Sequence, residues 1–67
     1  MIKVFLMDGN APISTFHLSV LPKSGERLLV NIKGIIRKYE VERLEFYVQP
    51  GEPENSHIKL YCFEVDL

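Results

Sequence analysis

The chain has 67 residues, which suffice for one small domain with a single hydrophobic core but not for two. Eight Lys and Arg residues against nine Asp and Glu give a net charge of −1, so no strong overall field draws the molecule to nucleic acid or anionic lipid. The single cysteine, Cys62, excludes an intramolecular disulfide. Asp8 interrupts the first apolar run too early for a signal sequence, and no apolar run approaches membrane length. We therefore expect one cytoplasmic domain over residues 1–67, without membrane contact.

In the first third of the chain, β-rich runs alternate with turn signals. Residues 2–7 favour a strand that ends at Asp8-Gly9, a dipeptide typical of hairpin turns. Residues 13–21 alternate between apolar and polar side chains, which predicts a half-buried strand. Its expected inner-face residues are Phe16, Leu18 and Val20. The polar loop over residues 22–26 then reverses the chain.

Residues 27–39 carry two competing patterns. Their apolar positions alternate as in a strand, but those from Leu28 to Tyr39 also fit helical spacing. Many of these residues are β-branched, and Gly34 would cost about 1 kcal/mol inside a helix. Lys33-Gly34 instead suits a hairpin turn. Two strands joined at this turn are the favoured interpretation, and a helix at about residues 26–40 is the alternative.

After this hairpin the apolar phase changes. Tyr39 and Val41 have one parity, and Leu44, Phe46 and Val48 have the other. A β-bulge between Glu42 and Arg43 would reconcile the two halves. Residues 49–56 form a polar loop with two prolines, and residues 58–67 are apolar on both faces, which is typical of a central strand.

Five strands with short loops and one bulge predict an all-β fold, a small five-stranded rolled sheet or SH3-like barrel. The alternative is an α+β fold with the helix at residues 26–40. The segment 21–30, with its loop from Pro22 to Glu26, is followed by a turn and Tyr39-Glu40-Val41. This pattern resembles the small, mostly uncharacterised SH3-like barrel proteins of phages and bacteria. The resemblance implies a barrel fold and supplies no catalytic residues.

No group of residues in the sequence has the pattern of a catalytic or metal site. His17, His57 and Cys62 are the available soft metal ligands, but they lack paired ligand spacing. Cys62 stands between two aromatic residues, so we expect burial to raise its pKa and keep it unreactive. The closely spaced acidic residues are Glu40, Glu42 and Glu45. They stand near Arg37 and Arg43, with which we expect solvated ion pairs. We expect no enzyme activity, cofactor or metal.

Binding is the remaining class of function, and the sequence offers two sets of candidate residues. It holds more apolar residues than a one-sided sheet can hide, which predicts an exposed patch for a protein partner or a second copy. The residues assigned to this patch are Tyr47, Tyr61 and Phe63. A basic cluster beside a tyrosine suits phosphates and a stacked base, which makes nucleic-acid binding the alternative. Its residues are Lys33, Arg37, Lys38 and Tyr39.

We therefore interpret the chain as a non-enzymatic cytoplasmic module that acts through protein–protein contacts. The resemblance suggests a phage or mobile-element accessory or inhibitory protein. A homodimer is one form that such a contact can take, and a nucleic-acid-binding small barrel is the alternative function.

Overall fold

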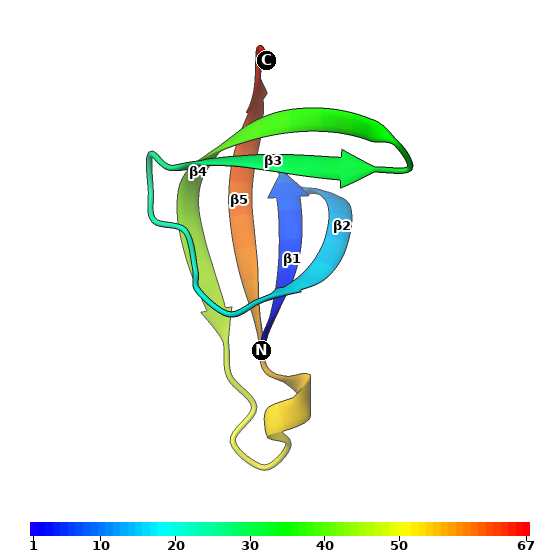
Figure 1. Ribbon diagram of the computed structural model, residues 1–67. Coiled ribbons are helices and arrows are strands. Elements are labelled where there is room, and N and C mark those ends of the chain that lie inside the picture. The colour runs from blue at the N-terminus through cyan, green and yellow to red at the C-terminus, as the bar shows by residue number, and fades with distance from the viewer.

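Five strands form one mixed sheet in the computed structural model, which describes residues 1–67. The elements in chain order are β1 (Ile2–Asp8), β2 (Ala11–Leu18), β3 (Arg27–Ile32), β4 (Ile35–Tyr47), the 3-10 helix η1 (Pro53–Asn55) and β5 (His57–Val65). Across the sheet the order is β2-β1-β5-β4-β3, with β1 and β5 parallel and all other neighbours antiparallel (Figure 1). The prediction that the last strand is central is confirmed.

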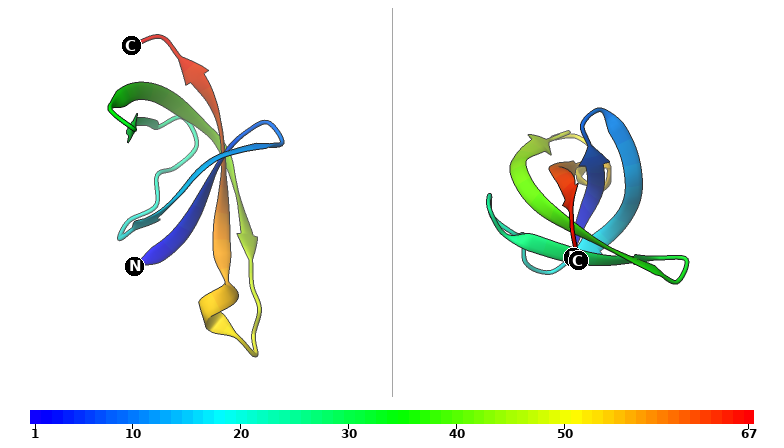
Figure 2. Two further views of the ribbon diagram at one scale, coloured as in Figure 1. Left: turned by 90° about the vertical axis from the view of Figure 1, so that its right-hand side faces the viewer. Right: turned by 90° about the horizontal axis from the view of Figure 1, so that it is seen from above.

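The sheet curls strongly around one of its faces. Seen from above in Figure 2, the strands follow an open arc, which gives the sheet a concave inner face and a convex outer face. The two edge strands, β2 and β3, share no hydrogen-bonded ladder, so the arc is a half-barrel and not a closed barrel. The predicted all-β, five-stranded rolled sheet is confirmed.

The β3–β4 hairpin turns at Lys33 and Gly34, as predicted. Both residues have positive φ, 53° for Lys33 and 86° for Gly34, which is the backbone of a type I′ turn. Gly34 adopts this backbone without steric cost, and its N–H donates to Asn31 Oδ1 at 2.9 Å. The alternative α+β fold with a helix at residues 26–40 is wrong, because every residue of β3 pairs with β4 across this turn.

Strand β4 contains the predicted β-bulge. Its register with β5 shifts between Val41 and Arg43, so Glu42 is the extra residue. Val41 before the bulge is 1% exposed, and Leu44 after it packs against the same core. The bulge therefore allows residues of opposite sequence parity to face the same side of the sheet.

Three residues expected on the inner face lie outside the core. Val20 is 78% exposed because β2 ends at Leu18, two residues before it. Phe46 and Val48 are 64% and 69% exposed, because they lie where the chain leaves the sheet for the loop before β5. Phe46 has the predicted inward parity, opposite the buried Ile58, but the core does not extend to it.

The core fills the concave face. Its fully buried residues are Val4, Leu6, Tyr39, Val41, Leu60 and Cys62, and residues packed against them are Ile13, Phe16, Leu18, Leu21, Leu28, Val30 and Leu44.

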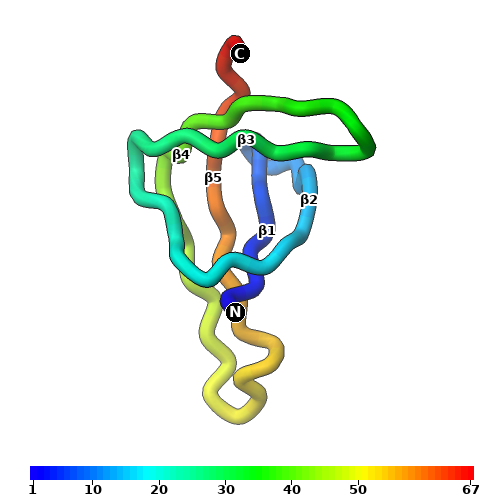
Figure 3. The backbone as a smooth tube through the Cα atoms, viewed as in Figure 1, coloured from blue at the N-terminus to red at the C-terminus, as the bar shows by residue number.

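The connection between β2 and β3 runs around the open side of the sheet (Figure 3). Two backbone hydrogen bonds tie its end to β4, from Gly25 N–H to Val41 O and from Val41 N–H to Glu26 O, both at 2.8 Å.

The buried Tyr39 provides a test of the core. Its side chain is 1% exposed, and its hydroxyl has no hydrogen-bond partner. A buried polar group without a partner costs about 1–3 kcal/mol. We expect Tyr39→Phe to keep the fold and raise the free energy of unfolding by about 1 kcal/mol, because the ring remains while the unpaired hydroxyl is removed. Urea denaturation followed by circular dichroism measures the change, and a clear loss of stability would contradict the prediction.

Candidate functional site

An open seam separates the two edge strands. Strands β2 and β3 stand at the two ends of the strand order, and residues of both line the same two hollows across the gap in the half-barrel. A hollow of about 330 Å³ is lined by Pro12, Ile13, Ile32, Lys33, Ile35 and Arg37. A second, of about 280 Å³, is lined by Ser14, Phe16, Leu18, Leu28, Leu29, Val30 and Asn31. We call the region formed by these two hollows the seam.

The seam has unsatisfied pairing capacity as well as apolar walls. Each of its two strands has a strand neighbour on one side only. An edge strand presents backbone N–H and C=O groups that can pair with a further extended chain. The half-buried side chains of Phe16, Leu18 and Leu28 line the space beside these edges.

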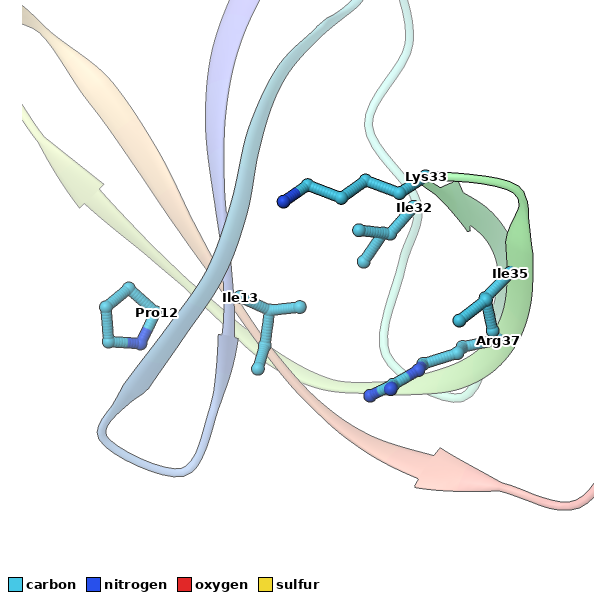
Figure 4. Close-up of a pocket in the computed structure, with 6 residues that line it drawn as sticks. All are labelled: Pro12, Ile13, Ile32, Lys33, Ile35 and Arg37. Atoms are coloured by element: carbon cyan, nitrogen blue, oxygen red, sulfur yellow. The ribbon is translucent and has the colours of Figure 1, made fainter.

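One end of the seam is cationic. Lys33 stands in the turn of the β3–β4 hairpin, and Arg37 has the inward parity of Tyr39 on β4. Figure 4 shows both side chains reaching from the hairpin toward β2, where Ile13 stands opposite them. Neither cation takes part in an ion pair, and no acidic residue lines either hollow. The seam therefore combines an apolar trough with unneutralised positive charge at one end.

The residues predicted to bind nucleic acid do not form one cluster. Lys33 and Arg37 line the first hollow of the seam. Lys38 alternates with Arg37 and Tyr39 along β4, and so lies on the opposite, outer face. The assignment of Tyr39 is wrong, because the curled sheet buries its side chain to 1% exposure and leaves no ring face for a base.

The residues predicted to contact a protein do share one face. On β5 the buried residues alternate with Tyr61 and Phe63, which places both on the outer side, and Tyr47 on β4 is paired with His57 of β5 on that side. Two further aromatic residues on this face, Phe5 and His57, were not predicted from the sequence. The His57 ring stacks on Tyr47 at 4.8 Å between centroids and forms a T-shaped contact with Phe5 at 4.5 Å. We call these five residues the outer aromatic face.

Arg43 and Glu45 hold Tyr61 in place on this face. The Arg43 guanidinium lies 3.9 Å from the Tyr61 ring centroid and donates to Glu45 Oε2 at 3.1 Å. The Tyr61 hydroxyl donates to Glu45 Oε1, also at 3.1 Å. The predicted ion pair of Glu45 with Arg43 is confirmed, whereas Glu40 pairs with Arg27 at 3.3 Å and not with Arg37, which faces the other way.

A third hollow, of about 300 Å³, lies at the end of the sheet near the N-terminus. Its lining residues are Met1, Ile2, Lys3, Phe46, Tyr47, Val48, Pro53, Ser56, His57 and Ile58. Met1, Phe46 and Val48 are each more than 60% exposed. Exposed apolar residues therefore gather at this end of the sheet, and the predicted homodimer stays a prediction.

The groups considered for catalysis and metal binding are dispersed. No three or more His, Cys, Asp or Glu side chains are placed together to hold a metal ion. Cys62 is buried, and its Sγ lies 3.6 Å from Leu60 O. Burial, with a smaller effect from the Asp8 carboxylate, raises the pKa of this thiol to about 11, which confirms the expected direction. No helix in the structure is long and apolar enough to span a membrane.

Comparisons of the chain with family models, with curated proteins and with solved structures found no match. The resemblance to SH3-like barrel proteins therefore stays a prediction.

The sequence contained a signal for the outer aromatic face but none for the seam. Lys3, Phe5 and Met7 alternate with the buried Val4 and Leu6, so period-two parity alone could have placed Phe5 outside. The seam depends on which strands end up at the two edges. That is decided by pairing between strands far apart in the chain.

The raised pKa of Cys62 predicts a pH dependence of stability. Between about pH 9 and 11 the unfolded chain loses the thiol proton while the folded protein keeps it, so the free energy of unfolding falls as pH rises. This contribution is at most about 3 kcal/mol. Urea denaturation at several pH values should show a shallower fall for Cys62→Ala than for the wild type, because the variant lacks the thiol. Equal slopes would contradict the assignment.

Proposed function

We propose that the chain is a non-enzymatic protein-binding module that takes an extended, acidic and apolar segment of a partner protein into the seam. The observation that carries this proposal is the pair of unpaired edge strands facing each other over two hollows, one mainly apolar and one with Lys33 and Arg37 in its lining. An entering strand extends the sheet from β2 or from β3, and the hollows receive alternate side chains.

The lining of the seam favours a polypeptide over a nucleic acid. Its walls are mainly aliphatic, from Ile13 on β2 to Val30 and Ile32 on β3. Strand addition uses backbone hydrogen bonds for affinity and side-chain pockets for specificity, and both are available here. Stacking of bases requires exposed ring faces, and the seam's one aromatic residue, Phe16, is half-buried against the core.

The charge at one end of the seam defines the chemistry of the partner. Lys33 and Arg37 have no acidic neighbour in an ion pair, so a carboxylate on the bound segment gains an attraction without breaking one. Charged groups at the rim of an interface mainly set specificity and the rate of association. The expected segment therefore alternates apolar and polar residues and carries Asp or Glu at the end that reaches Lys33.

A pair of matched synthetic peptides tests this proposal. Both peptides alternate valine and threonine. One carries two glutamates at each end, and the other carries two lysines at each end. At low salt we expect the glutamate peptide to bind more tightly by on the order of tenfold. Amide shifts of the labelled protein, followed by NMR, should concentrate on β2 and β3.

Charge reversal provides the control. In the double variant Lys33→Glu and Arg37→Glu, the preference should invert toward the lysine peptide. Lys23→Glu makes the same kind of change in an exposed loop that lines neither hollow, and should leave the preference as in the wild type. Equal binding of both peptides, or shifts confined to the outer face, would reject the seam as the binding site.

A further inference from the structure

The outer face of the sheet carries local positive charge in a chain of net charge −1. The cations whose strand positions place them there are Lys3, Arg27, Lys38, Arg43 and Lys59. The acidic residues placed there, Glu40 and Glu45, are in ion pairs with Arg27 at 3.3 Å and Arg43 at 3.1 Å, and Glu42 occupies the bulge beside Arg43. The three lysines take part in no ion pair.

Aromatic side chains are interleaved with these cations. Four of the seven Phe and Tyr residues lie on this face: Phe5, Tyr47, Tyr61 and Phe63. Lys3 Nζ is 5.3 Å from the Phe5 ring centroid, and Lys59 pairs in register with Phe5. Tyr47 and Phe63 are 45% and 41% exposed. The three strands that carry the set, β1, β5 and β4, run side by side (Figure 1).

We propose that this outer face is a second binding surface, for single-stranded nucleic acid. The lysines contact phosphates, and the Phe63 ring and the face of Tyr47 turned away from His57 offer stacking surfaces. The Arg43 guanidinium, 3.9 Å from the Tyr61 ring centroid, offers a further cation beside the rings. This site lies on the opposite side of the sheet from the concave core, and it does not depend on the seam.

Three features favour a single strand over other partners. The centre of a protein interface is depleted in lysine, whereas here lysines alternate with the rings. Aromatic stacking needs unpaired bases, whose faces a duplex keeps within its own stack. The lysines outside ion pairs can bind phosphates without first breaking an ion pair within the protein.

Fluorescence anisotropy with a labelled oligothymidine of about 15 nucleotides tests the proposal, because single-strand sites commonly span about 4–16 nucleotides. We expect binding at low salt that is at least fivefold tighter than binding to a duplex of the same length. With three phosphate contacts, the slope of log K against log salt should be about −2.

Two kinds of variant separate phosphate contact from stacking. Lys59→Glu should weaken binding by on the order of tenfold and reduce the salt slope. Phe63→Ala should weaken it about fivefold and leave the slope unchanged, because a ring contributes no charge. Phe63→Leu keeps apolar volume without a ring plane, and should also weaken binding even if Phe63→Ala disturbs the fold. Circular dichroism checks each variant.

Lys23→Glu in the exposed loop is the matched control and should bind as the wild type does. Lys33→Glu in the seam should also bind the oligonucleotide as the wild type does. A failure of the outer face to bind nucleic acid can therefore be distinguished from a failure of the seam to bind a peptide. The proposal is overturned if the wild type shows no salt-dependent binding or binds the duplex as tightly as the single strand. It is also overturned if Lys23→Glu loses as much affinity as Lys59→Glu. Sedimentation velocity that finds a dimer dissociated by Phe63→Leu would assign the face to a second copy instead.

Discussion

Strand β5 is hydrogen-bonded on both sides, and the alternation of its side chains assigns the two faces of the whole sheet. Ile58, Leu60 and Cys62 face the core, so the residues between them face outward. Its parallel register with β1 places Val4 and Leu6 on the same inner side. Because side chains alternate with a period of two, a slip of one residue would exchange core and surface throughout the sheet.

The bulge at Glu42 is what allows a strand as long as β4 to satisfy this constraint. Before the bulge Val41 faces the core, and after it Leu44 does, so both halves of β4 contribute to one interior. The β3–β4 hairpin extends from the first half and crosses one end of the arc (Figures 1 and 2). The sheet does not complete the circle, and the seam between β2 and β3 is the result.

The seam and the outer face differ in chemistry because successive side chains of a strand lie on opposite sides of the sheet. Arg37 and Lys38 are neighbours in sequence but lie on opposite sides of β4, one toward the seam and one on the outer face. The seam thus joins a cationic end to an aliphatic trough, while the outer face interleaves lysines with rings. An aliphatic trough with open strand edges suits an extended polypeptide, and rings among unpaired lysines suit stacked bases and phosphates.

The sequence by itself determined the features that depend on neighbouring residues. The strands, the turn at Lys33-Gly34, the bulge between Val41 and Arg43 and the buried Cys62 all follow from local patterns of parity, β-branching and glycine placement. Only the tertiary structure decided that Tyr39 is core and not a stacking platform, because parity shows that residues share a face without showing which face is covered. It also decided that β2 and β3 are the edges, since edge positions result from pairing between distant segments, such as β1 with β5.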